Sequence, residues 1–202
     1  YISAGIYRTI LVIGSESLSR LVDWTDRGTC ILFGDGAGAV LLKAAEGRSY
    51  RPVAHSDGKG GPALTGPGAA GRVRSIDQDP KETKTEYITM NGKDVFQFAV
   101  RKVPQVIQEV LDENELSAED IDWFVLHQAN ARIVDSVARR LRLDIEKFPM
   151  NLQEYGNTSS ASIPILLNEL NRKGILREGQ KLVLAGFGAG LSWGASILEW
   201  DI

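Results

Sequence analysis

A histidine lies where a strand is expected to end and a helix to begin, in the segment Leu126-His127-Gln128-Ala129-Asn130. Side chains at the carboxyl end of a strand point into the crevice where α/β proteins bind ligands. The positive end of the following helix would favour a neutral imidazole. His127 is therefore a candidate for hydrogen-bonding or proton-transfer chemistry. Taken alone, however, a single histidine is more often a packed or solvated residue, and we leave His55 with that interpretation.

Two further segments carry chemistry only if their surroundings allow it. Asn157, between Tyr155-Gly156 and Thr158-Ser159-Ser160, is by itself typical of a turn and a helix N-cap. The glycines of 186–190 are typical of a tight turn between strands. Neither 186–190 nor the similar run 34–38 is a phosphate-binding P-loop, because no Lys-Ser/Thr pair and no helix follows.

The single cysteine, Cys30, is expected inside an apolar strand. An apolar setting without a positive partner keeps a thiol unreactive, so we assign Cys30 a structural role. One cysteine also excludes an internal disulfide framework and a cysteine-rich metal site.

The elements that must position these residues follow from hydrophobic periodicity and from glycine and proline. They alternate between strands and helices, which predicts a layered α/β fold, and the glycine-rich strand pairs near residues 36 and 188 could be equivalent parts of a duplicated fold. The predicted strands are 9–14 (fully buried), 29–33, 37–43, 121–126, 146–151, 182–186 and 192–199. The predicted helices are 94–113 (kinked or broken at Pro104), 131–141 (Ile133, Val134, Val137 and Leu141 inward) and 159–172, with a capping box at 117–120 and an irregular loop over 44–86.

Composition limits the class of protein. The 202 residues are 43% hydrophobic and 24% charged, which is an ordinary globular balance. No apolar run reaches the roughly 20 residues that span a bilayer, so no membrane segment is expected. A net charge of -3 disfavours nucleic-acid binding. The first residue is Tyr1 rather than Met, and no signal peptide is expected, so we interpret the chain as a fragment of a cytoplasmic protein.

Four motifs occur together in a fixed order: Phe33–Ala39, His127–Asn130, Gly156–Ser159, and Gly186–Gly190 followed by Trp193-Gly194. This set closely resembles the β-ketoacyl-acyl-carrier-protein synthase III family, over nearly all of the chain except about residues 44–86. The resemblance implies the thiolase fold, with the end of its first half in residues 1–86 and the complete second half in residues 87–202.

The resemblance also implies roles. His127 and Asn157 match the last two members of a Cys-His-Asn set, and the nucleophilic cysteine is expected upstream of Tyr1, outside this chain. The side chains of His127 and Asn157 would both donate hydrogen bonds to the oxyanion that forms on a malonyl thioester. Phe187 would lie over the malonyl carboxylate, and the backbone N–H of Ala189 would serve a second oxyanion hole.

Binding residues follow from the same resemblance. Asn130 would help to hold the pantetheine arm or an active-site water, and the backbone of Gly92 would meet the pantetheine arm. Arg27 would lie near the phosphates of coenzyme A. Arg132 and Arg139, seven residues apart on one helix, would dock an acidic acyl-carrier protein. The alternative is a solvated cationic face, which is the favoured interpretation for Arg139.

The implied function is the initiating condensation of fatty-acid synthesis, between an acyl-CoA primer and malonyl-acyl-carrier protein. It needs no metal and no cofactor, since the coenzyme A thioester is a substrate, and it implies a homodimer that pairs through residues 9–14. Elongating synthases, with two histidines, and thiolases, with a late cysteine, are disfavoured. Two alternatives stay open: another Cys-His-Asn synthase of polyketide or quinolone type, and a non-catalytic fragment.

Overall fold

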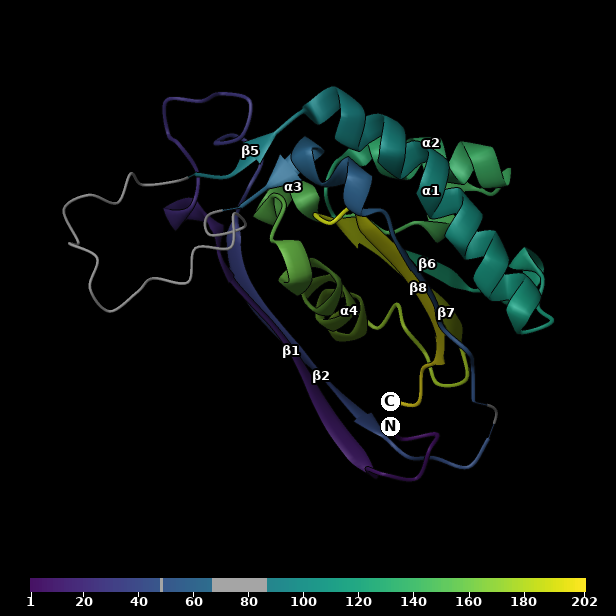
Figure 1. Ribbon diagram of the computed structural model, residues 1–202. Coiled ribbons are helices and arrows are strands. Elements are labelled where there is room, and N and C mark those ends of the chain that lie inside the picture. Colours follow the sequence, from purple (N-terminus) through teal and green to yellow (C-terminus); the bar gives the residue numbers. More distant parts are fainter. Residues whose placement is uncertain (48, 67–86) are drawn as a thin grey trace.

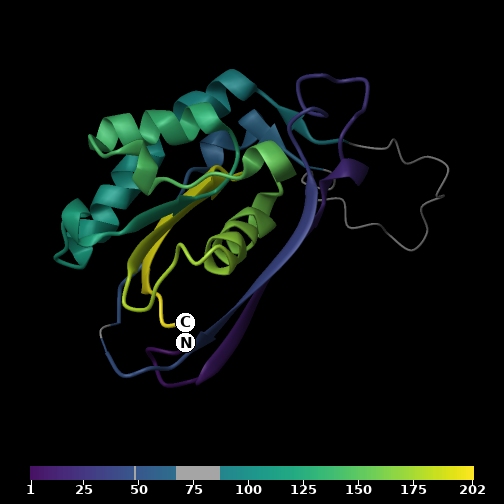
Figure 2. The same cartoon turned by 180° about the vertical axis from the view of Figure 1, so that it is seen from behind.

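The computed structural model describes residues 1–47, 49–66 and 87–202, which form stacked layers of helix and sheet (Figure 1). Helices α1 (Gly92–Glu113) and α2 (Ala131–Leu141) cover one face of a four-stranded sheet, and α4 (Ser162–Arg172) lies against the other face. The hairpin of β1 (Thr9–Ser17) and β2 (Asp35–Lys43) packs on the far side of α4, as the reverse view also shows (Figure 2). The predicted layered α/β architecture is confirmed. None of the helices in these ranges has the length and apolar character to cross a membrane.

The four-stranded sheet has the order β3-β8-β7-β6, with β3 at Val53–Ser56, β8 at Ser192–Glu199, β7 at Lys181–Gly188 and β6 at Trp123–Leu126. Strands β6 and β7 are parallel, whereas the other neighbours are antiparallel. The connection from β6 to β7 therefore crosses over and includes α2 and α4. Residue 127 is the first residue after β6, so it lies at the carboxyl edge of the sheet. Strand β3 precedes residue 86 yet pairs with β8, so the sheet draws on both of the halves that we predict from the resemblance.

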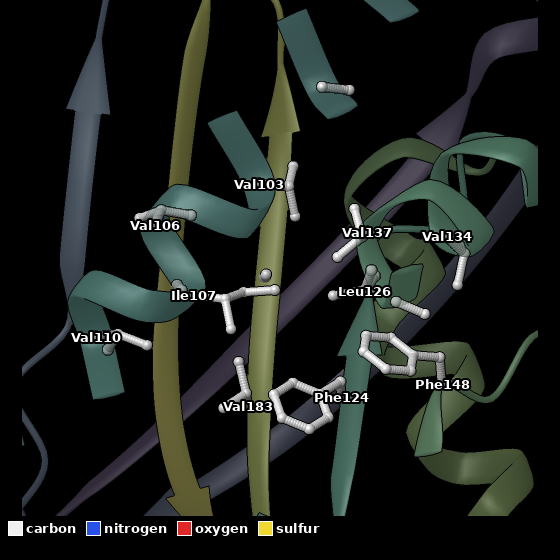
Figure 3. Close-up of a cluster of buried hydrophobic side chains, with 14 of the residues drawn as sticks. Val103, Val106, Ile107, Val110, Phe124, Leu126, Val134, Val137, Phe148 and Val183 are labelled. Atoms are coloured by element: carbon white, nitrogen blue, oxygen red, sulfur yellow. The ribbon is translucent and has the colours of Figure 1, made fainter. Parts of the chain in front are cut away.

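The larger core lies between α1, α2 and the sheet, where apolar side chains from all three interlock (Figure 3). The predicted helix 131–141 is confirmed with the same ends, and Ile133, Val134 and Val137 are buried as its periodicity requires. The sequence predicts a kink or a break at Pro104, and a break is wrong, because α1 continues through this residue. Proline removes one backbone hydrogen bond, but fully buried Val103 and Val106 anchor the helix on both sides.

The first hairpin differs from prediction in two ways. Residues 29–32 form turns and Phe33 makes only a single β-bridge with Asn157, because Asp26 accepts hydrogen bonds from the Gly28 N–H (2.9 Å) and the Thr29 hydroxyl (2.7 Å). Such local side-chain bonds compete with strand pairing. Cys30 therefore lies half-buried in a turn, against the small cluster of Leu18, Val22 and Ile88.

The glycines of 34–38 do not form a turn between strands, since β2 already begins at Asp35. A Cβ on Gly38 would lie 2.7 Å from the Cβ of Pro164, and one on Gly14 would lie 2.6 Å from the Ser160 carbonyl carbon. These glycines allow β1 and β2 to approach the start of α4 closely. The outer face of the hairpin is exposed, with Leu11 at 58% and Ile13 at 62%, so the predicted full burial of 9–14 is wrong for this chain.

Replacing Gly14 by alanine should lower the free energy of unfolding by about 1–3 kcal/mol, because the methyl group must push β1 away from Ser160. Urea denaturation measures the effect. Gly58→Ala is the matched control, since a Cβ at Gly58 meets no atom within 4 Å. Equal stabilities of the two variants would contradict the close approach.

The remaining elements complete the comparison with the prediction. The loop 44–86 is only partly irregular, since it holds β3 and two short elements, and residues 67–86 lie outside the described ranges. The predicted strand 146–151 is wrong, because the Asp144 side chain accepts the Glu146 N–H and starts a 3-10 turn instead. The capping box at 117–120 and the strands near 123, 182 and 192 are confirmed. The short elements are 3-10 turns at Leu18–Arg20, Gly58–Ala63, Ala118–Asp120, Ile145–Lys147 and Ser159–Ala161, strands β4 (Leu64–Thr65) and β5 (Thr89–Met90), and helix α3 (Leu152–Tyr155).

Candidate active site

A cavity of about 560 Å³ opens beyond the end of β6, between the starts of α1 and α2 and the β7–β8 turn. His127 reaches it from the end of β6, and Asn157 reaches it from the segment before α4. Phe187 and Ala189 line it from the end of β7 and the following turn. His127 and Ala189, 62 positions apart in the sequence, thereby line one space.

His127 is held on two sides. Its backbone N–H donates to the Ala185 carbonyl (2.8 Å), which extends the β6–β7 ladder by one residue. Its ring nitrogen Nδ1 lies 2.7 Å from the hydroxyl of Ser162, the first residue of α4. The ring also packs edge-on against Phe187, with 5.3 Å between the ring centroids. Since Nδ1 faces α4, the other nitrogen, Nε2, is left for the cavity.

Burial lowers the pKa of His127 to about 4, although the Glu16 carboxylate and the Ser159 carbonyl both oppose that shift. The imidazole is therefore neutral near pH 7. The direction agrees with the expectation drawn from the helix start, but the main cause is the loss of water around the ring.

Acid should destabilise the protein through this histidine. The unfolded side chain has a pKa of 6.5 and the folded one a pKa of about 4, so between these values only the unfolded chain binds the proton. The free energy of unfolding should therefore fall by about 3 kcal/mol as the pH drops through this window. Denaturation at several pH values gives the free energy of unfolding of the wild type and of His127→Gln. The difference between the two proteins isolates His127, because the titrating carboxylates are the same in both. A wild-type slope in His127→Gln would contradict the assignment.

Asn157 is fixed through both its backbone and its side chain. Its backbone N–H donates to the Leu32 carbonyl (2.9 Å), and its carbonyl accepts from the Gly34 N–H (2.9 Å). Its side-chain oxygen Oδ1 accepts the Ser159 N–H (3.0 Å). Ser159 has a φ of 49°, a left-handed conformation that is uncommon outside glycine. Because Oδ1 is occupied, the amide NH₂ of Asn157 is the group available to the cavity.

The other predicted site residues divide into two groups. Asn130, Gly92 and Arg132 line the same cavity as His127. Asn130 also caps α2, since its Oδ1 accepts the Arg132 N–H (2.9 Å). Arg27, in the turn region after β1, and Arg139, on the last turn of α2, are exposed and do not line it.

Comparison with known proteins agrees with this arrangement. Residues 1–58 match the family model described as 3-oxoacyl-[acyl-carrier-protein] synthase III, and residues 111–200 match the model of its C-terminal part. The chain belongs to the synthase III family. The second model includes both His127 and Asn157, so both residues lie in the C-terminal part of a synthase III.

Individual relatives of this synthase III chain are similar over its whole length. The β-ketoacyl-[acyl-carrier-protein] synthase III of Clostridium acetobutylicum is 46% identical over 99% of the chain and 61% of its own length. The synthase III structure from Thermus thermophilus is 40% identical, with a TM-score of 0.86, over 99% of this chain and 61% of that one. The priming β-ketosynthase of the R1128 polyketide pathway is 33% identical, with a TM-score of 0.87, over 99% and 59%. The chain thus spans about three fifths of the length of these relatives.

Two residues near the cavity of this synthase III chain were not singled out from the sequence. Ser162 contacts the His127 ring, and Glu16 accepts hydrogen bonds from the Ser160 N–H (3.2 Å) and hydroxyl (2.5 Å) beside the site. The only local sign of Ser162 in the sequence is its position five residues after Asn157. Nothing local in the sequence points to Glu16, because it reaches the site from β1. Within the described ranges, no cluster of three or more metal-binding side chains is found.

Proposed function

We propose that this chain forms the C-terminal part of an initiating condensing enzyme, which joins an acyl-CoA primer to malonyl-acyl-carrier protein. The observation that carries the proposal is the pair of donors at the cavity. Nδ1 of His127 and Oδ1 of Asn157 are both engaged by the protein, which directs Nε2 and the amide NH₂ to one space. Two fixed donors aimed at one small volume suit an oxyanion.

The proposed reaction has two stages. First, a cysteine supplied from outside these 202 residues takes the acyl group from the acyl-CoA, and the backbone N–H of Ala189 contributes to an oxyanion hole. Second, malonyl-acyl-carrier protein loses carbon dioxide, and the resulting enolate attacks the acyl-enzyme. His127 and Asn157 then stabilise the negative charge on the malonyl thioester oxygen. The apolar ring of Phe187 disfavours the compact malonyl carboxylate relative to its spread-out transition state.

The same proposal assigns the substrate-binding residues. Asn130 and Gly92, on the cavity wall, would hold the pantetheine arm. Exposed Arg132, at the edge of that wall, and Arg139, two helical turns farther along α2, would meet the acidic carrier protein. Arg27 would lie near the phosphates of coenzyme A, which enters as a substrate rather than as a cofactor.

Assembly and location complete the proposal. A homodimer would form through β1, whose pairing partner among the described residues is β2 alone, so that its other edge is available to a second β1. Residues 1–86 would belong to the first half of a thiolase fold and residues 87–202 to the second. The cytoplasm is the proposed compartment.

Joining this chain to the N-terminal segment of the Clostridium acetobutylicum synthase tests the function. That segment is expected to carry the cysteine, and we call the resulting fusion protein the joined enzyme. With acetyl-CoA and malonyl-acyl-carrier protein, the joined enzyme should form 3-ketoacyl product, whereas the 202 residues alone should form none. If the 202 residues alone form product, the proposal that the nucleophilic cysteine lies outside them is wrong. A folded joined enzyme without turnover would contradict the function itself.

Primer choice separates the alternatives. Curated relatives are β-ketoacyl-[acyl-carrier-protein] synthases III, which favours fatty-acid synthesis over a polyketide or quinolone role. Varying the acyl-CoA supplied to the joined enzyme measures that preference directly. A joined enzyme that accepts acetyl-CoA best supports the initiating role.

A further inference from the structure

The hydroxyl of Ser162 sits at the back of the catalytic cavity with three polar neighbours. It lies 2.7 Å from Nδ1 of His127, 2.8 Å from the carbonyl oxygen of Ser159 and 3.3 Å from the backbone nitrogen of Gln128. The residue is only 3% exposed, so water does not compete for these positions. A buried hydroxyl has a single hydrogen, and the direction in which it points matters.

The neighbours restrict that direction. The Gln128 N–H can only donate, so the Ser162 oxygen accepts from it. The hydroxyl hydrogen can then go to one of two acceptors, the Ser159 carbonyl, which also accepts the backbone N–H of Ser162, or Nδ1 of His127. The basic nitrogen of a neutral imidazole is a better acceptor than a peptide oxygen that already accepts one hydrogen bond. Donation to Nδ1 leaves each of these polar groups with a partner, because the Ser159 carbonyl keeps the backbone N–H of Ser162.

We propose that Ser162 donates its hydroxyl hydrogen to Nδ1 of His127 and thereby keeps the proton of the neutral imidazole on Nε2. A neutral histidine has one N–H, and a hydrogen bond to one ring nitrogen decides which nitrogen carries it. Nε2 faces the cavity, so this tautomer presents a donor to the thioester oxygen. The opposite tautomer would present a lone pair there and repel the oxyanion. Ser162 is a positioning residue in this scheme, which rests on the proposed function.

The Ser159 carbonyl supplies the alternative that Ser162 suppresses. It lies close enough to the His127 ring to stabilise a ring N–H. Without the Ser162 hydroxyl, Nδ1 has no donor to accept from, and an Nδ1–H could donate to the Ser159 carbonyl instead. Loss of the hydroxyl should therefore move the proton from Nε2 to Nδ1.

Nitrogen NMR of the histidine-labelled 202-residue protein at neutral pH reads the tautomer without any turnover. The chain has two histidines, and His55→Gln leaves only the signals of His127. We expect Nε2 to give a pyrrole-type signal and Nδ1 a pyridine-type signal. In most molecules of Ser162→Ala, Nδ1 should instead give the pyrrole-type signal and Nε2 the pyridine-type signal. Ser162→Thr keeps the hydroxyl and should give the same signals as the wild type. An Nδ1–H in the wild type overturns the proposal, whether or not the variants fold, and so does an unchanged pattern in folded Ser162→Ala.

A kinetic measurement on the joined enzyme gives a second readout. Ser162→Ala should lower kcat for carbon dioxide release at least about tenfold with little change in KM, because a wrong tautomer removes a contact made in the transition state. An unchanged kcat in a variant with the exchanged tautomer would contradict the link to catalysis. The two proposals fail separately: an inactive joined enzyme with the expected tautomer contradicts only the function, and an active one with the opposite tautomer contradicts only the role of Ser162.

Discussion

Replacing His127 by alanine in the joined enzyme should reduce carbon dioxide release from malonyl-acyl-carrier protein by about 10²–10³-fold. The imidazole Nε2–H is one of two donors aimed at the developing oxyanion, and removing one such donor typically costs about 3–4 kcal/mol of barrier. Acylation of the cysteine by acetyl-CoA should stay near the wild-type level, because that step uses a different oxyanion hole. Radiolabelled acetyl transfer and release of labelled carbon dioxide measure the two half-reactions separately.

A matched control is available in the other histidine of the chain. His55 lies on β3, where its Nε2 contacts Glu109 (2.6 Å), and it does not line the cavity. His55→Ala should leave both half-reactions unchanged. An equal loss of both half-reactions in His127→Ala would show that His127 supports the site as a whole and not the malonyl step.

Asn157→Asp should be more damaging than Asn157→Ala, with a loss of carbon dioxide release of about 10³-fold or more. The Ser159 N–H already binds Oδ1 of Asn157, so the second side-chain atom points to the cavity. In asparagine that atom is a donating NH₂ group. In aspartate it is a carboxylate oxygen, which repels the negative charge that forms on the thioester oxygen.

Carbon dioxide release by the two Asn157 variants measures this order. Asn168→Asp adds the same charge to an exposed position of α4 and should leave the rate unchanged. An Asn157→Asp variant that is as active as Asn157→Ala would show that the amide does not donate to the reacting oxygen. Because Asn157→Asp is nearly isosteric, its unfolding curve should stay close to that of the wild type.

Several elements could be predicted from the sequence because their pattern is local. The helix 131–141 repeats apolar residues at helical spacing, and burial of Ile133, Val134 and Val137 follows from that spacing alone. The strand before His127 and the helix after it place the imidazole at a sheet edge without any knowledge of its neighbours. The capping box at 117–120 is likewise contained within four residues. The motif order added the family, which local patterns could not.

Other features depend on contacts between distant segments, and only the tertiary structure decided them. The glycines at 14 and 38 match a turn or a close approach equally well, and the backbone across from them, 126 or more residues later in the chain, settles the matter. Residues 29–33 are apolar enough for a strand, yet hydrogen bonds from Thr29 and Cys30 to Asp26 hold 29–32 in turns.

The orientation of the His127 and Asn157 side chains also depends on contacts between distant segments. Nothing local to Ser162 or Ser159 relates them to His127 or Asn157, because a helix start and a strand end meet only when α4 packs on the sheet. The sequence by itself therefore determined the family and singled out His127 and Asn157, which both line the cavity. The folded chain decided which of their atoms face the cavity, since that depends on which polar partners packing brings within about 3 Å.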